Sequence, residues 1–307
     1  PDYRAIFLAC LGWPLIRCIL SHTTSQRPYR LSMNPTLVGK LLKFSWPLML
    51  SGLLLFLVFH GDRAVVGHYF SMHELGFFSL VLTAFLLPSQ LLHKVYDSLF
   101  LSSLSKAFRH RDRFESQQFL IWHSLFALST AYVLFSILLG PWLFIFLFGE
   151  KYAPGLNLLP WIVLMVSVRI LRIATSMLAL ATAQPYCELY ANLVRASALP
   201  IAIIGLAMGY PIECVPIAGI IGEVLALFVG LVSLNLPVSH AVKPPAVSGM
   251  IMLWLASMVF ITAEIVIDIN PPYVSATLAA VLLITMILFF IKQYPKFTIE
   301  RGFQNDV

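Results

Sequence analysis

The chain has 307 residues, of which 59% are hydrophobic and only 11% charged, and its formal net charge is +6. Soluble domains carry about 25% charged residues, so this composition excludes a water-soluble domain and predicts a polytopic integral membrane protein. The basic residues lie in alternate loops between apolar runs, as membrane insertion requires, and form no basic stripe on a soluble surface. We therefore predict no nucleic-acid partner.

Apolar runs long enough to cross a bilayer, which takes roughly 20 residues, recur along the chain. Turn signals rich in Gly, Pro and Asn separate most of them. The sequence predicts an all-α transmembrane helical bundle with about nine helices. The predicted spans are 5–20, 44–67, 76–101, 118–140, 156–182, 189–209, 214–236, 248–268 and 273–291.

The loops that follow the first, third, seventh and ninth spans hold most of the Lys and Arg residues outside the spans. Basic loops stay in the cytoplasm, so these loops are predicted to be cytoplasmic, with the C-terminus. The chain then starts outside. The run at 6–20 lacks a basic n-region and a small-residue cleavage site, so we do not expect a signal peptide. Because the chain begins with Pro1, we expect an upstream part.

Polar residues on one face of the 76–101 span form the first candidate site. Gln90, Lys94 and Asp97 follow i, i+4, i+7 spacing, and Thr83 continues their stripe. A charge at a helix centre costs about 2.5–3.5 kcal/mol on insertion scales, which favours a functional reason for keeping it. The alternative is a structural ion pair between Lys94 and Asp97 near the cytoplasmic end. His93 points about 100° away from Lys94.

Two arginines in the 156–182 span form the second candidate site. Arg169 and Arg172 lie one turn apart on one face, and neither has a carboxylate within a turn of its own helix. Buried guanidiniums need a water-filled cavity, an acid from another helix or an anionic ligand. Their planar fork suits phosphate. The alternative is a structural pairing with Asp62 or Glu223.

The 214–236 span carries Glu223 in its interior. Small residues recur every four positions around it, which predicts a helix-packing ridge. They are Ala218, Gly222, Ala226 and Gly230. Glu223 itself is a candidate coupling-ion ligand or a partner for arginine. Arg195 and Glu264 lie near predicted helix ends, so we expect both to reach the membrane interface.

Sequence motifs for nucleotide binding, zinc hydrolases and serine hydrolases are absent. The four cysteines (Cys10, Cys18, Cys187 and Cys214) and the eight histidines show no metal-ligand spacing. We predict no catalytic residue, no metal site and no organic cofactor.

Two stretches resemble a known family. Residues 41–80, "LLKFSWPLMLSGLLLFLVFHGDRAVVGHYFSMHELGFFSL", are similar to the helix that opens the second lobe of bacterial polysaccharide flippases. These O-antigen and capsule exporters belong to the multidrug/oligosaccharidyl-lipid/polysaccharide exporter superfamily. Residues 146–163, "FLFGEKYAPGLNLLPWIV", resemble a later turn of the same family. Phe78 stands where the family usually has Tyr, and a common Pro is missing near residues 99–108.

The resemblance implies a fold and a domain organisation. Residues 1–43 would be the last helix of an N-terminal lobe followed by a cytoplasmic linker. Residues 44–236 would be a six-helix C-terminal lobe, and residues 237–307 two additional transmembrane helices with a short cytoplasmic tail. The protein would lie in the bacterial cytoplasmic (inner) membrane.

The resemblance also implies a function. The family flips an undecaprenyl-diphosphate-linked oligosaccharide across the membrane by alternating access, without ATP. The implied diphosphate or cavity charges are Arg169, Arg172, Lys94 and Arg63. The implied coupling or partner groups are Asp62, Asp97, Glu223 and Gln90, with Na+ or H+ as the coupling ion. Expected partners are membrane lipid, the N-terminal lobe and polysaccharide biosynthesis enzymes.

Three alternatives stay open from the sequence. A cation-coupled multidrug exporter of the same superfamily would have a cavity of acids and aromatics, whereas the charges here are mainly arginines. A membrane glycan polymerase or acyltransferase would need a large outer loop or buried His/Asp chemistry. Within the flippase reading, Asp62 and Arg63 either diverge, one toward the cavity and one across the bundle, or both lie at the outer interface.

Overall fold

The computed structural model describes residues 3–24, 34–234 and 254. In these residues every regular element is a helix, which confirms the all-α prediction. Six helical stretches are long and apolar enough to cross a membrane, and each overlaps one of the second to seventh predicted spans. They are Pro35–Tyr69, Met72–Ala107, Asp112–Leu138, Glu150–Ala181, Pro185–Ala207 and Cys214–Ser233. The eighth and ninth predicted spans lie outside the described residues, apart from Trp254.

The chain divides into two units, residues 1–43 and 44–307. The first contains α1 (Tyr3–Thr24), which covers the first predicted span, and the opening turns of α2. Its membership of an N-terminal lobe stays a prediction.

The second unit begins within α2 (Pro35–Tyr69) and holds the remaining helices. In chain order these are α3 (Met72–Tyr96), the π-helical η1 (Asp97–Leu101), α4 (Ser102–Ala107), α5 (Arg111–Leu138), α6 (Gly140–Phe148), the 3-10 helix η2 (Glu150–Leu158), α7 (Leu159–Ala181), α8 (Pro185–Ala196), α9 (Ala198–Ala207) and α10 (Cys214–Ser233).

Local signals account for several helix boundaries. A capping box starts α3. The Ser71 hydroxyl accepts a hydrogen bond from the Glu74 backbone N–H, and the Glu74 carboxylate accepts one from the Ser71 backbone N–H. Gly149, at φ 87°, ends α6 in a conformation that favours glycine. Pro185 occupies the start of α8, where its missing N–H costs nothing.

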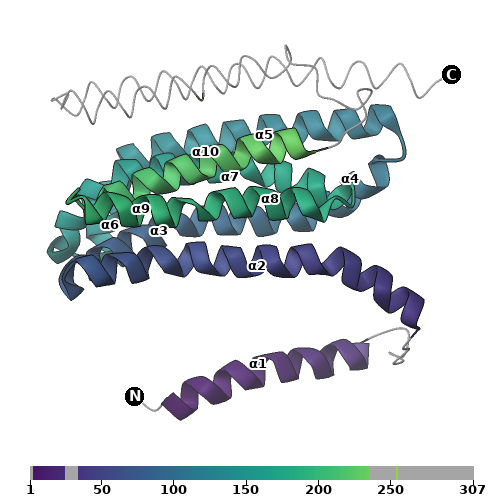
Figure 1. Cartoon of the computed structure of the whole chain (residues 1–307), viewed down its shortest axis with the longest axis horizontal. Helices are drawn as coiled ribbons and strands as arrows, with labels where there is room; N and C mark the ends of the chain where they lie inside the picture. The colour runs from purple at the N-terminus through teal and green to yellow at the C-terminus, as the bar shows by residue number, and fades with distance from the viewer. Residues whose placement is uncertain (1–2, 25–33, 235–253, 255–307) are drawn as a thin grey trace. The chain divides into compact units, whose positions relative to one another are not determined.

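Helix α7 forms the centre of the second unit. It packs against α3, α5, α8 and α10, and all the residues of its most apolar window are buried. Figure 1 shows these helices running beside one another. A helix that is apolar on all sides is a core helix, so the two arginines that α7 carries are necessarily buried. By contrast, only 17% of the corresponding window of α2 is buried.

The predicted ridge on α10 is confirmed. Its four small residues are all buried, and α10 packs against α7 and α8. A Cβ atom added to Gly222 would lie 2.8 Å from the Ala198 Cβ and 2.9 Å from the backbone oxygen of Arg195. Gly222 therefore allows the backbones of α8 and α10 to approach closely.

Gly222→Ala is expected to destabilise the protein by about 1–3 kcal/mol, because overpacking forces the two helices apart. Thermal unfolding in detergent measures the effect. Gly52→Ala is the matched control, since a Cβ at this helical position has nothing within 4 Å. Equal melting temperatures for the Gly222→Ala variant and the wild type would contradict the close contact.

Candidate functional site

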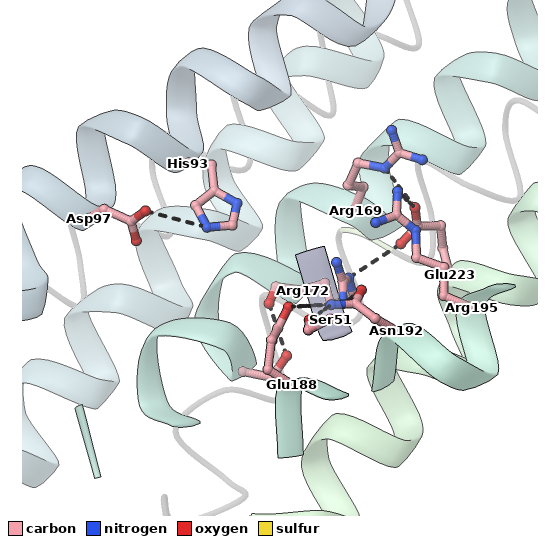
Figure 2. Close-up of polar contacts among 10 residues, drawn as sticks. Ser51, His93, Asp97, Arg169, Arg172, Glu188, Asn192, Arg195 and Glu223 are labelled. Atoms are coloured by element: carbon pink, nitrogen blue, oxygen red, sulfur yellow. Dashed lines mark hydrogen bonds and ion pairs between the residues drawn. The ribbon is translucent and has the colours of Figure 1, made fainter. Parts of the chain in front are cut away.

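Three arginines converge on one glutamate in the core of the second unit. Helix α7 supplies Arg169 and Arg172, α8 supplies Arg195, and α10 supplies Glu223 (Figure 2). The Glu223 Oε1 atom lies 2.6 Å from the Arg169 Nε and 2.7 Å from an Arg195 Nη atom. Its Oε2 atom lies 3.4 Å from the Arg172 Nε. We call these four residues the arginine cluster.

The arginine cluster is almost completely removed from solvent. The exposed fractions of the side chains are 11% for Arg169, 6% for Arg172, 2% for Arg195 and 1% for Glu223. Charges buried to this degree persist only when they neutralise one another. Of the two acids that the sequence offers as partners for Arg169 and Arg172, Asp62 and Glu223, it is Glu223 that pairs directly with both.

Arg172 also joins a second group of polar residues on α8. One of its Nη atoms donates to the Asn192 Oδ1 at 3.0 Å and lies 3.6 Å from the Glu188 Oε1. The Asn192 amide donates to Glu188 at 2.9 Å and to the Ser51 hydroxyl of α2 at 2.7 Å (Figure 2). These bonds connect α7, α8 and α2 through Asn192.

The Phe59 ring of α2 faces two members of the cluster. The guanidinium carbons of Arg169 and Arg195 lie 5.1 Å and 5.2 Å from the ring centroid, within the range of a cation–π interaction. Helix α2 thus contacts the arginine cluster through the Phe59 ring, whereas its Ser51 hydroxyl contacts Asn192, the partner of Arg172.

The cluster has more donors than acceptors. Among the described residues, the Arg169 Nη1 and Arg195 Nε atoms are buried without a hydrogen-bond partner. The Arg172 Nε and Arg195 Nη2 atoms lie at ion-pair distance from Glu223 but lack hydrogen-bond geometry. Each guanidinium carries five N–H donors. Three guanidiniums therefore offer more donors than two carboxylates can accept. The cluster therefore keeps donors that a further acceptor could use.

Asp62 and Arg63 diverge to different neighbours. The Arg63 guanidinium donates to the Thr83 hydroxyl of α3 at 2.8 Å. The Asp62 carboxylate interacts electrostatically with Arg169, Arg195 and Glu223. Both residues are half-buried. Adjacent positions on a helix point about 100° apart, so one residue faces the cluster and the other reaches across to α3.

The alternative ion pair between Lys94 of α3 and Asp97, the first residue of η1, is not found among the described residues. Asp97 instead lies 3.5 Å from His93, one residue further back (Figure 2). At i, i+4 the short imidazole stands over Asp97, whereas the longer Lys94 is exposed and its stem can extend toward the membrane surface. Gln90 is exposed as well, so neither Gln90 nor Lys94 joins the arginine cluster.

The expected interfacial position of Arg195 is wrong. The predicted span began at residue 189, but α8 begins at Pro185 and continues closely into α9. This earlier start places Arg195 near the middle of the 185–207 stretch. From Pro185 onward, Glu188, Asn192 and Arg195 share one helix face at i, i+4, i+7, a signal that could have identified them. Glu264 lies outside the described residues.

Comparison with known proteins gives one match. Residues 2–156 fit the family model described as "Polysaccharide biosynthesis protein". No curated protein and no solved structure matches the chain. The matched part includes the α2 residues Ser51, Phe59 and Asp62, whereas the arginine cluster lies beyond it.

Proposed function

Because this chain belongs to the polysaccharide biosynthesis protein family, we propose that it carries a lipid-diphosphate-linked oligosaccharide across the cytoplasmic membrane by alternating access. Its family gives it a role in polysaccharide synthesis, and its apolar helices make it a multi-pass membrane protein. The proposal makes it a transporter rather than an enzyme.

The observation that carries the proposal is the arginine cluster. Three guanidiniums at membrane depth share one carboxylate and keep unused donors. A diphosphate offers several charged oxygens in the geometry that guanidinium forks bind. We assign the diphosphate to Arg169, Arg172 and Arg195. Arg63 bonds to Thr83 and Lys94 is exposed, so both would meet the substrate outside the cluster.

Loss of the gene tests this function. We expect lipid-linked oligosaccharide to accumulate on the cytoplasmic leaflet and surface polysaccharide to disappear, because the carrier lipid cannot cross unaided with a glycan attached. The measurement is the accessibility of the glycan to an impermeant lectin in intact spheroplasts, compared with lysed ones. A plasmid copy of the gene serves as the control.

The same experiment separates the alternatives. Loss of a glycan polymerase would leave single glycan units exposed at the outer surface, and lectin-accessible units would therefore refute flipping. Loss of a multidrug exporter would leave the polysaccharide unchanged and lower drug resistance. The buried acids favour the flippase over that exporter, since Glu188 and Glu223 are both paired with arginine.

The proposed orientation places the 106–115 loop in the cytoplasm and Glu150 outside, with the C-terminus cytoplasmic. A cysteine introduced at Glu150 should react with an impermeant maleimide in intact cells, and one introduced at Arg109 should not. Both residues are exposed, which makes them comparable probes. The reverse labelling pattern would invert the topology.

A further inference from the structure

We infer that Glu223 is a built-in anion that the substrate's diphosphate displaces from the arginines, and that its displacement is linked to the uptake of a proton. The inference rests on the proposed function, since it requires a diphosphate to bind the arginine cluster. It adds a role for Glu223 and a choice of coupling ion.

The geometry makes Glu223 and a phosphate competitors for the same donors. The carboxylate already holds one nitrogen from each of the three arginines, at 2.6, 2.7 and 3.4 Å. A phosphate group binds guanidinium through the same paired-oxygen contacts. The unused Arg169 Nη1 and Arg195 Nε donors belong to guanidiniums whose other nitrogens already contact Glu223, so a diphosphate that binds these arginines competes with the carboxylate.

Once displaced, the Glu223 carboxylate would have no cation to replace the arginines. The groups that face it are Arg169 and Arg172 of α7, Arg195 of α8 and Asp62 of α2. Glu188 of α8 reaches it only through Arg172. Helix α9, which also packs against α10, carries no charged residue. With the arginines occupied by diphosphate, only acids remain.

The fold also restricts how far Glu223 can move away. Its neighbour Gly222 lies so close to α8 that an added Cβ would come within 2.8 Å of the Ala198 Cβ and 2.9 Å of the Arg195 backbone oxygen, which leaves α10 little space to rotate against α8. A carboxylate that stays buried without a counter-charge is far less stable than the neutral acid. The displaced carboxylate therefore takes a proton and becomes a carboxylic acid, with no other bond made or broken.

This exchange couples two ligands at one site. A proton on Glu223 frees the arginines for diphosphate, and diphosphate on the arginines favours the proton on Glu223. Such coupling is reciprocal, so each ligand raises the affinity for the other by the same factor.

Calorimetry on the purified full chain tests the linkage, with farnesyl diphosphate as a soluble prenyl diphosphate probe. Titrations at pH 7 in two buffers of different ionisation enthalpy give the number of protons taken up on binding. We expect the wild type to take up about one proton more than Glu223→Gln. We also expect Glu223→Gln to bind roughly tenfold or more tightly, because the internal competitor has lost its charge.

The control variant is Glu213→Gln, which removes a carboxylate from the start of the same helix without touching the arginines. It should match the wild type in affinity and in proton uptake. If Glu223→Gln does not fold, Glu223→Gln with Arg195→Gln removes one charge of each sign and keeps Arg169 and Arg172. This double variant should bind without the additional proton.

The outcomes separate the two proposals. Equal proton uptake by the wild type and the Glu223 variants would overturn the inference and leave the proposed function standing. Weaker binding of farnesyl diphosphate by folded Glu223→Gln would also overturn the inference, because removal of a competing carboxylate cannot lower the affinity. If farnesyl diphosphate binds to none of these proteins, the proposed diphosphate site and the inference both fall.

Discussion

Replacement of Glu223 by alanine is expected to lower the free energy of unfolding by about 3–5 kcal/mol, the usual cost of removing one partner from a buried ion pair. Three guanidiniums would then remain in the core with Glu188 as the nearest paired acid. Alanine, unlike glutamine, also removes the oxygen that could accept their hydrogen bonds. Denaturant titration in mixed micelles, followed by tryptophan fluorescence, measures the change.

Two further variants sharpen this test. Glu213→Ala removes a half-buried carboxylate near the start of α10 and should cost much less. Glu223→Leu combined with Arg195→Leu leaves the net charge of the site unchanged. Buried ion pairs replaced by apolar residues are often neutral in stability, so part of the lost stability should return, although Arg169 still lacks its carboxylate. A Glu223→Ala variant as stable as the wild type would show that the arginine cluster does not form.

Under the proposed function, Arg169→Ala and Arg172→Ala are each expected to reduce glycan export by roughly 10–100-fold, because each would remove charge-assisted hydrogen bonds to the substrate's diphosphate. The variants should still insert and fold, since Glu223 keeps two of its three arginines in either case. Arg→Lys should restore only part of the export, because lysine supplies the charge without the fork. Surface polysaccharide is measured beside the amount of protein in the membrane.

A purely structural role for these arginines gives a different result. The alanine variants would then lose folded protein, and a second substitution at Glu223 would restore it. Lys151→Ala, an exposed residue outside the cluster, is the control and should leave export unchanged. Normal export by the variant that carries both alanines would eliminate Arg169 and Arg172 from the transport site.

Tight packing and spare hydrogen-bonding capacity coexist in this site. Helix α7 is buried along its length, yet it presents two guanidiniums to a single shared carboxylate. Helix α2 is mostly exposed, yet its Phe59 ring contacts the cluster and its Ser51 hydroxyl bonds to Asn192 beside it. A helix held by few side-chain contacts can separate at lower cost than one embedded in the core. Under the proposed alternating access, we therefore expect α2 to be the wall of the site that moves.

The membrane setting and the helices could be predicted from the sequence alone. A bilayer requires about 20 apolar residues in each crossing helix, and this requirement is met within a single continuous segment. The ridge of Ala218, Gly222, Ala226 and Gly230 was equally visible, because the helical repeat places residues four apart on one face. Arg169 and Arg172 were identified as a pair for the same reason.

Only the tertiary structure decided which groups these arginines meet. Glu223 is 54 residues from Arg169, and Ser51 is 141 residues from Asn192. The periodicity of one helix says which of its faces is polar but not which face of another helix lies opposite. Arg195 shows how sensitive the site is to a boundary: the start of α8 at Pro185 moved it from the predicted interface into the core. Apolar length is a property of one segment, whereas the neutralisation of a buried charge depends on how separate segments pack.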